Sequence, residues 1–559
     1  MAEKSGEYAK GAGEFDVYDQ SPTRDPDPEQ HHLHRGLKSR HITMIAIGGA
    51  IGTGLIIGTG SALAKAGPAS ILISYSLVGV LVWIVMCAVG EMGAWLPLEG
   101  GFTAFADRYC DSALGFALGW TYWFKYIIVT PNQLTAGALV IQFWVKPERV
   151  NPGVFIAIFM VLIACINYFG IRVFGEFEFY LSSFKVIVVI GLILLSFILA
   201  LGGGPNHDRI GFRYYHDPGA FKPYLKTGSA GNFLGFWSSM VTAVFAYLGT
   251  ELVGVTLGEA QNPRKTIPRA IKLTFYRIVF FYVLSVLFLG MIVPYDSPDL
   301  VFATKVTNNS ASASPFVVAI KLAGIPVLPH ILNACILIFV FSAANSDLYI
   351  GSRTIYGLAK EGKAPRIFAW TDKRGVPVFS LLICILISSL AFMNVSSDSR
   401  NVFLYFVNVV SILGLLTWIS ILVAHIGFIR ARKAQNVPVE SLAFKSPFGL
   451  WGSSIALFFC CLIALTKNFN VFVHDEKYGN LDVPNFITGY IGIPVYLTLI
   501  AGYKLVYRNK AIDPKTADLW TGREEYERET NYWLELEREK KESTKPQSTF
   551  YKRFVSWLL

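Results

Sequence analysis

The sequence is poor in charged residues for its length. Of its 559 residues, 16% are Asp, Glu, Lys or Arg, whereas soluble proteins average about a quarter. Hydrophobic residues make up 53% of the chain and aromatic residues 14%. This composition excludes an ordinary soluble protein and predicts an all-α polytopic membrane protein.

Motifs that define several other protein classes are also missing. There is no GxxxxGK[ST] phosphate loop, no GxSxG nucleophile motif, and no Ser/His/Asp set that the expected topology would bring together. The basic residues lie beside apolar segments and do not form one stripe with stacked aromatics. We therefore expect no enzyme, no nucleotide-driven pump, no cofactor and no nucleic-acid partner.

Cysteine is scarce, and its spacing favours no metal or disulfide framework. The seven cysteines are an odd number, without CxxC or Cys/His pairs at metal spacing. Six of them lie within apolar segments, and we predict that they are buried thiols. His31, His32 and His34 form a small cluster in the N-terminal tail. We assign no metal there, because no rigid scaffold lies beside the cluster.

What the chain does have is apolar segments of membrane-spanning length. About 20 apolar residues cross the roughly 30 Å hydrocarbon core of a bilayer. The chain has about twelve such segments, near residues 42–65, 71–95, 113–142, 153–170, 180–201, 232–257, 273–293, 328–358, 378–394, 402–428, 450–467 and 486–507. We therefore predict about twelve transmembrane helices, numbered below as spans one to twelve.

The distribution of Lys and Arg predicts the orientation. The connections "NPRKTIPRAIK", "KEGKAPRIFAWTDKRG" and "RARKAQ" are dense in positive charge, which favours the cytoplasmic side. With an even number of spans, both termini then lie in the cytosol. We divide the chain into a cytosolic tail (1–40), a twelve-helix body (41–508) and a second cytosolic tail (509–559). We expect disorder or a short amphipathic helix in the tails.

Glycine interrupts two of the spans. The stretch "AIGGAIGTGLIIGTG" in span one holds six glycines, each costing about 1 kcal/mol against Ala in a helix interior. In span six, Gly249, Thr250 and Glu251 fall in mid-membrane. Interruptions at corresponding places in two five-span halves are typical of inverted-repeat transporters. For span one, close helix packing through small residues remains an alternative.

A broken helix offers two unlike ends to a ligand. The N-terminal end of a half-helix presents free N–H groups and favours a carboxylate, whereas a C-terminal end presents carbonyls and favours an ammonium. A zwitterion fits both ends. The predicted contacts are Gly52, Thr53 and Gly54 in span one, and the carbonyls of Phe245, Ala246 and Leu248 in span six.

Four long segments carry a family resemblance. "GGAIGTGLIIGTG", "GEMGAWLPLEGGF", "FAYLGTELVGVTLGEAQNPRKTIPRAI" and "SAANSDLYIGSRTIYGLAKEGKAPRIF" resemble fungal amino-acid permeases of the amino acid/polyamine/organocation superfamily, with the likeness running over about 34–508. The resemblance implies a leucine-transporter-type 5+5 inverted repeat with broken helices 1 and 6. It implies proton-coupled amino-acid uptake at the plasma membrane, with the substrate's carboxylate in span one and its amino group in span six. It also implies ubiquitin-ligase adaptors acting at the tails, beside the surrounding lipids.

Four ionisable residues within the spans are candidates for function. The resemblance makes Lys185, about five residues into span five, the leading proton-coupling residue; the alternative is that it reaches the cytoplasmic interface. Glu251 could accept the substrate's ammonium through water or relay the proton. Glu91 is closer to the interface, and we expect it to pair with a basic residue such as Arg353. We expect Asp347 to pair with Lys185 or Arg353.

Span three bears on the range of substrates. Where many relatives carry Glu, this chain has Gln133, which removes a repulsion that would oppose an acidic substrate. Lys125 lies two turns away, and we expect it to add positive charge near the site. The segment resembles the dicarboxylic branch of the family, so glutamate and aspartate are the first expected substrates. The alternative is that Gln133 only packs, leaving a broad-range or neutral permease.

Two further sets of residues are expected near the site. Ser342, Asn345 and Ser346 in span eight share a helix face, and we expect this face to meet span one and the substrate. The candidate aromatic gates, for which ordinary packing is the alternative, are Phe245, Tyr247 and Tyr405.

We expect the body to work by alternating access, without covalent chemistry. Two alternatives remain open at this stage. A nutrient receptor could keep the permease fold and signal through its tails, and an exchanger without net proton flow would have the same residues.

Overall fold

The computed structural model describes residues 52–98, 100–146, 148–169, 171–255, 263–298, 300, 314–395, 399–473 and 481–543. Within these ranges the chain is helical and contains no strand. The histidine cluster at 31–34 and the first glycines of span one lie outside the described residues.

The first half of the described chain holds eleven named helical elements that matter here. In order they are η1 (Gly54–Gly58), α2 (Thr59–Ala66), α3 (Pro68–Trp95), α4 (Gly101–Tyr109), α5 (Ser112–Ile141), α6 (Pro152–Tyr168), α7 (Ile171–Ala200), α8 (Gly228–Tyr247), α9 (Leu252–Val255), α10 (Pro263–Arg277) and η4 (Ile278–Val283). The second half continues with α11 (Leu284–Ile292), α13 (Pro315–Leu322), α14 (Leu328–Lys360), α15 (Val378–Ser388), α16 (Ser399–Ala434), α17 (Gly449–Thr466), α18 (Val483–Tyr490), α19 (Gly492–Tyr507) and α20 (Arg523–Ser543).

Several of these helices are long and apolar enough to cross a membrane. Six described segments meet that test: Pro68–Trp95, Val173–Ala200, Ile267–Ile292, Leu328–Lys360, Asn401–Ala434 and Gly449–Phe472. The pair α18 and α19 passes it together, with a 42° bend between them. Two shorter apolar helices cover Pro152–Tyr168 and Val378–Met393. The chain is therefore a polytopic membrane protein.

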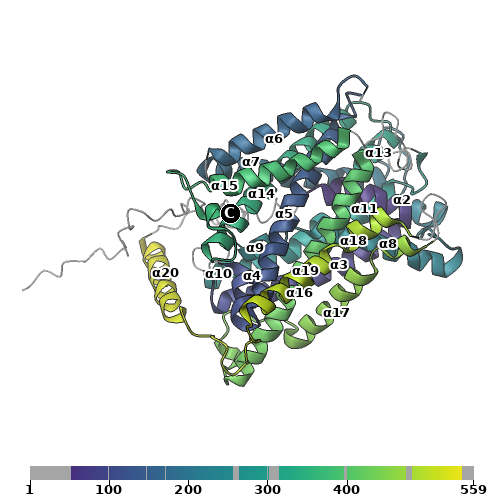
Figure 1. Cartoon of the computed structure of the whole chain (residues 1–559). Helices are drawn as coiled ribbons and strands as arrows, with labels where there is room; N and C mark the ends of the chain where they lie inside the picture. The colour runs from purple at the N-terminus through teal and green to yellow at the C-terminus, as the bar shows by residue number, and fades with distance from the viewer. Residues whose placement is uncertain are drawn as a thin grey trace, which may run out of the picture.

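The centre of the bundle is formed by α5 and α14, which pack against each other. Figure 1 shows α6 and α7 on one side of this pair, and α16, α17 and α19 on the other. The helix α5 is buried along most of its length. A helix enclosed by other helices does not need to be apolar all round, which explains why α5 carries Lys125, Asn132 and Gln133 inside the membrane body.

The predicted bounds of span five were wrong at the N-terminal end. The hydropathy pattern predicts a start near residue 180, but α7 begins at Ile171. The acidic residues Glu176 and Glu178 lower the hydropathy of this first part without ending the helix. In consequence Lys185 lies at the middle of a 30-residue helix and not near its end.

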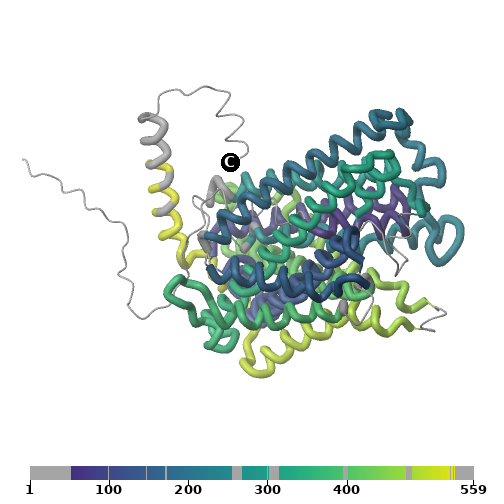
Figure 2. Tube along the Cα trace, turned by 90° about the horizontal axis from the view of Figure 1, so that it is seen from above, coloured from purple at the N-terminus to yellow at the C-terminus, as the bar shows by residue number. Residues whose placement is uncertain are grey.

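The segment after α19 is docked on the body. The indole N–H of Trp95 at the end of α3 donates to the carbonyl of Leu519 (3.0 Å), and Arg523 donates to the Trp95 carbonyl (2.8 Å). The Arg523 guanidinium also lies 3.6 Å from the centre of the Trp95 ring. Arg108 on α4 forms an ion pair with Asp518 (2.8 Å). Beyond these contacts, Figures 1 and 2 show α20 standing off one end of the bundle.

Candidate functional site

Span six is interrupted where the glycine pattern predicts. The helix α8 ends at Tyr247, Leu248 is extended (φ −61°, ψ 145°), and α9 begins at Leu252. Gly249 has φ 91°, a left-handed conformation that glycine adopts without the steric cost other residues would bear. The break leaves main-chain groups between α8 and α9 outside regular helix, although the Phe245 carbonyl already accepts from the Leu248 N–H (3.3 Å).

Span one can be followed only from Gly52 onward. Gly52 lies at a bend, and the chain then enters the π-helical turn η1 at Gly54. Such π-helical turns are rare and frequently found at functional sites. The predicted N–H donors Gly52, Thr53 and Gly54 therefore lie at the bend and at the first residues of this π-helical turn.

The two interrupted spans touch each other at these points. A Cβ atom on Gly54 would lie 2.5 Å from Cα and 2.9 Å from N of Ala246, and 3.1 Å from the Phe245 ring. A Cβ on Gly52 would meet nothing within 4 Å. Gly54 is thus required for the close approach of the two main chains, and Gly52 faces open space beside it.

A series of hydrogen-bonded polar side chains connects this contact to α5 and α14. The Thr53 hydroxyl donates to Oε1 of Gln133 on α5 (2.9 Å), and Nε2 of Gln133 donates to Oδ2 of Asp347 on α14 (3.3 Å). Thr53 and Gln133 are 2% and 5% exposed. Asp347 thus has Gln133 as a partner that the sequence did not predict, while Arg353 lies over the Tyr349 ring (5.0 Å).

The polar face of span eight meets helices other than the expected one. Oδ1 of Asn345 accepts from Asn167 on α6 (3.0 Å), and Ser342 donates to Glu178 on α7 (2.7 Å). These two residues thus hydrogen-bond to α6 and α7, and the contact of this face with span one stays a prediction. Helical spacing fixes which residues share a face, but the neighbour that covers the face is decided by tertiary packing.

Lys185 is fully buried and does not reach an interface. Its Nζ lies 3.6 Å from Oε1 of Glu178, which is seven residues earlier on the same face of α7. Glu178 also accepts hydrogen bonds from Ser182 (3.0 Å) and Ser342 (2.7 Å). Glu178 was missed by the sequence reasoning, although its spacing from Lys185 places both on the same face.

Glu251 forms a buried ion pair with Lys125 of α5. The same carboxylate accepts from the Gly249 N–H (3.2 Å) and from the indole of Trp418 on α16 (3.3 Å). Lys125 also lies over the Tyr126 ring (4.3 Å). The positive charge that Lys125 was expected to add on the face of Asn132 is therefore balanced by Glu251, a partner that the sequence did not indicate.

Glu91 is paired, but not with a basic residue of the connection after span eight. Its Oε2 accepts from the Ser446 N–H (2.7 Å) and lies 3.4 Å from Nε2 of His425 on α16. Nδ1 of His425 lies 2.7 Å from the Ser453 hydroxyl oxygen. The expected pairing with Arg353 is wrong, and His425 was overlooked because it lies within an apolar run.

The aromatic candidates have different surroundings. The Phe245 ring lies edge-on to Phe403 with 6.2 Å between ring centres, directly beside the contact of the two spans. Tyr247 is fully buried and stacks on Tyr282 with 4.4 Å between ring centres. Packing therefore accounts for Tyr247, and its assignment as a gate was wrong.

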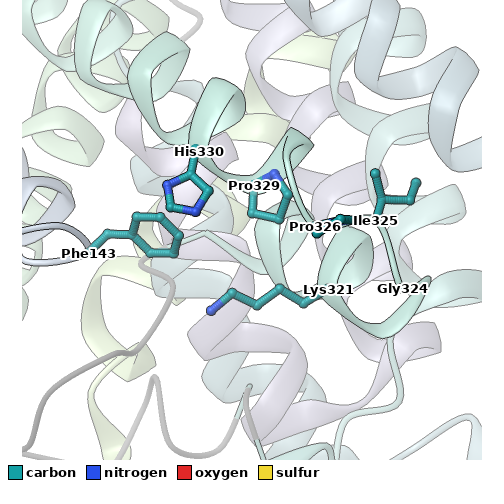
Figure 3. A pocket seen from close by; sticks show the side chains of 7 residues that line it. All are labelled: Phe143, Lys321, Gly324, Ile325, Pro326, Pro329 and His330. Atoms are coloured by element: carbon teal, nitrogen blue, oxygen red, sulfur yellow. The ribbon is translucent and has the colours of Figure 1, made fainter.

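A surface hollow of about 320 Å³ lies away from these residues. Figure 3 shows the residues around it, which come from the turn after α5 and from α13, α14 and their connection: Phe143, Lys321, Gly324, Ile325, Pro326, Pro329 and His330. It contains none of the predicted substrate contacts.

The cysteines of the described chain are all free. Cys87, Cys384 and Cys460 are buried as expected, but Cys165 on α6 is exposed on the apolar surface of the bundle. In the described ranges, no group of three His, Cys, Asp or Glu side chains could hold a metal ion.

Taken together, these features define a class of protein. A many-helix membrane protein in which an interrupted helix meets a π-helical turn of another segment, beside buried polar and ionic side chains, has the architecture of a secondary transporter. A family profile described as "Amino acid permease" matches residues 41–513. The chain therefore belongs to the amino acid permease family, and it is a transporter and not an enzyme.

Individual relatives agree with the family assignment. The chain is 54% identical to the dicarboxylic amino acid permease of Saccharomyces cerevisiae, over 95% of this chain and 87% of the relative. It is 46% identical to an uncharacterized amino-acid permease of Schizosaccharomyces pombe, over 87% and 92% of the two chains. It is 39% identical to the proline-specific permease of Emericella nidulans, over 93% and 95%.

Proposed function

We propose that this permease carries acidic L-amino acids, glutamate and aspartate first, into the cell together with protons. The observation that carries the proposal is the contact of Gly54 with Ala246, because it brings two irregular main-chain segments together beside the Thr53–Gln133 hydrogen bond. The 54% identical relative is a dicarboxylic amino acid permease, which supports a preference for acidic substrates.

In this proposal the substrate's two charged ends are held by main chain. The N–H groups at Gly52, Thr53 and Gly54 bind the carboxylate, since helix N-termini carry about half a positive charge. The carbonyls of Phe245, Ala246 and Leu248 bind the ammonium. Asn345, which is fixed by Asn167, contributes through the side of the site formed by α14.

In this proposal, the preference for acidic amino acids depends on the neutral side chain of Gln133. An amide at this place leaves a side-chain carboxylate of the substrate without a facing negative charge, whereas a glutamate would repel it through a medium of low dielectric constant. The hydrogen bond from Thr53 holds this amide next to the contact of the two spans.

Proton coupling is assigned to Lys185 and Glu251. Each belongs to a buried ion pair that joins two elements: Lys185 and Glu178 connect α7 with Ser342 of α14, and Glu251 connects the span-six break with Lys125 of α5. Because a change of protonation in such a pair removes its attraction, proton binding and release alter how firmly these elements are joined.

We extend the proposal to the whole permease, its tails and its driving force. The body (41–508) has twelve spans in a 5+5 inverted repeat and works by alternating access at the plasma membrane, with both tails in the cytosol and open to ubiquitin-ligase adaptors. The driving force is the proton gradient, where 100 mV is worth about 2.3 kcal/mol per charge. For a substrate of net charge −1, more than one proton is needed to bring positive charge inward.

The test is uptake of labelled glutamate in a permease-deficient fungal strain, with each of the twenty amino acids as competitor at two pH values. The proposal predicts that aspartate and unlabelled glutamate compete best, and that uptake is faster at the lower pH. Equal competition by neutral or basic amino acids would contradict the acidic range. Absence of uptake with normal surface abundance would favour a receptor.

A broad-range permease is the second candidate. It is favoured by relatives named for other substrates, such as the lysine-specific permease of Saccharomyces cerevisiae, which is 38% identical over 87% of this chain and 77% of the relative. The competition profile separates the two candidates directly.

A further inference from the structure

Asp347 is an acidic residue in the middle of a membrane-spanning helix. It lies at the twentieth position of the 33-residue helix α14 and is half-buried, while its neighbours Asn345 and Ser346 are buried. A carboxylate at such a depth is costly, so a functional role is the first hypothesis. In the described part of the chain, its short polar contact is to a neutral group, the amide of Gln133 (3.3 Å).

The two neighbouring ion pairs do not include Asp347. The charges whose fields reach it are Lys125 on α5 and Lys185 and Glu178 on α7. Lys125 forms its ion pair with Glu251, and Lys185 lies 3.6 Å from Glu178. Asp347 therefore belongs to neither ion pair, and its direct hydrogen bond is with Gln133.

The hydrogen bonds fix the orientation of the Gln133 amide. The Thr53 hydroxyl donates to Oε1, and Nε2 donates to Asp347. An ionised carboxylate can only accept hydrogen bonds, so it holds the amide N–H₂ group toward itself and leaves the amide oxygen facing Thr53. In this orientation Gln133 presents an acceptor toward the contact of the two spans.

A protonated Asp347 keeps one acceptor oxygen but makes the reverse arrangement possible as well. A carboxylic acid has an O–H donor, which pairs with the amide oxygen when the amide turns by half a rotation about its terminal bond. The N–H₂ group then faces Thr53, whose hydroxyl can accept as well as donate. Gln133 now presents donors where it presented an acceptor before.

We propose that Asp347 and Gln133 form a proton-dependent switch that gives the site donors for the side-chain carboxylate of an acidic substrate. This inference rests on the proposed function and names how an acidic substrate and a proton are bound together. The proton comes from the outer solution, resides on the Asp347 carboxyl while the substrate is bound, and leaves to the inner solution. Asp347 acts through Gln133 and is a positioning residue.

The test uses Asp347→Asn in the full-length chain, because an Asn amide is neutral at every pH and still donates and accepts. In the unaltered permease we expect the KM for glutamate to rise with pH between 5.5 and 7.5, by up to about tenfold per unit for one linked proton. In Asp347→Asn the proton bound at Asp347 is lost while the Lys185 and Glu251 pairs remain, so we expect the KM to rise less steeply with pH, by the contribution of one proton. The inhibition constant of glutamine, which lacks the second carboxylate, should change with pH less than that of glutamate.

The control is Asp296→Asn, an exposed carboxylate in the connection after α11, which should keep the normal pH profile. If Asp347→Asn does not reach the membrane, Gln133→Met tests the same link, since it removes the amide and leaves Asp347 in place. Its KM must likewise rise less steeply with pH than that of the unaltered permease.

The outcomes separate the two proposals. Absence of glutamate uptake by the unaltered chain contradicts the proposed function itself. Normal uptake together with an unchanged pH profile in both variants overturns the switch and leaves the acidic range standing.

Discussion

At the scale of single residues, Gly54 is the position in the contact of the two spans where a side chain has no room. A Cβ there would lie 2.5 Å from the Ala246 Cα, and main chain cannot move aside as a side chain can. We expect Gly54→Ala to separate the two spans, with an overpacking cost of about 1–3 kcal/mol. Initial rates of labelled uptake should fall by about tenfold, since 1.4 kcal/mol corresponds to that factor.

The matched control is Gly191→Ala in α7, where a Cβ would meet nothing within 4 Å. This change should leave uptake intact and favour the helix by about 1 kcal/mol. Equal uptake by the two variants at equal surface abundance would show that the close approach at Gly54 is not needed.

The Lys185–Glu178 pair yields a second prediction at this scale. Glu178→Gln leaves the buried ammonium without this counter-charge, and breaking one side of a buried pair costs about 3–5 kcal/mol. We expect a large loss of thermal stability in detergent. The double variant Glu178→Gln with Lys185→Met should regain stability, because it removes both charges, but uptake should respond less to the proton gradient than in the unaltered chain.

Ser183→Ala on the same helix serves as the control, since its hydroxyl bonds only within the helix to the Phe179 carbonyl (2.7 Å). If uptake by the double variant responds to an imposed pH gradient as strongly as in the unaltered chain, Lys185 is not part of the coupling.

At the scale of elements, the N-terminus of α5 has a strong cap. The Asp111 side chain accepts from the Ala113 N–H (2.9 Å) and pairs with Lys504 (2.6 Å) and Asn509 (2.6 Å). Burial alone would raise the pKa of Asp111, but the hydrogen bonds from Lys504, Ala113 and Asn509 outweigh it and lower the pKa below its ordinary value. The stabilisation is therefore present at neutral pH and is lost as the pH falls through the lowered pKa.

We expect Asp111→Ala to destabilise the protein by about 1–2 kcal/mol at pH 7, the usual cost of losing a cap. The melting temperature in detergent is the measurement, with Glu525→Ala on the exposed face of α20 as the control. A melting temperature unchanged from that of the control would contradict the capping role.

Elements also show what the sequence can and cannot predict. The interruption of span six was predicted because Gly249, Thr250 and Glu251 break an apolar run, and such local signals are visible in one sequence. The start of α7 was not, because Glu178 is buried against another helix and only looks like a boundary when packing is unknown. The 42° bend between α18 and α19 had no signal that we recognised.

The same distinction holds for the site. Thr53, Gln133 and Lys185 were identified from glycine breaks, buried polarity and the family resemblance. Their partners were not, since the bond from Thr53 to Gln133 joins residues 80 positions apart, and Asn167 and His425 sit in runs that look purely apolar. Which side chains meet across helices depends on tertiary packing, which hydropathy does not encode.

At the scale of the whole molecule, the segment after α19 ties several helices together. Arg523 contacts both the carbonyl and the ring of Trp95, and Leu519 is buried beneath them. We expect Arg523→Ala to weaken this docking by about 1–3 kcal/mol, the usual value for a hydrogen bond to a charged group. Limited proteolysis should then cleave the segment 510–530 faster than in the unaltered chain.

Arg528→Ala is the control, because Arg528 lies on the same helix with a side chain that is 83% exposed and pairs only loosely with Glu524 (3.9 Å). Cleavage at the same rate in Arg523→Ala and Arg528→Ala would contradict a role for the Trp95 contact in holding the segment.

The central claim is that the substrate lies between the two irregular segments and is held by their main chain. An experimental structure with glutamate bound tests it most directly. We expect the α-carboxylate within hydrogen-bonding distance of N–H groups at Gly52–Gly54, and the α-ammonium within reach of carbonyls at residues 245–248. Glutamate bound elsewhere, or a continuous helix through residues 246–250, would contradict the account.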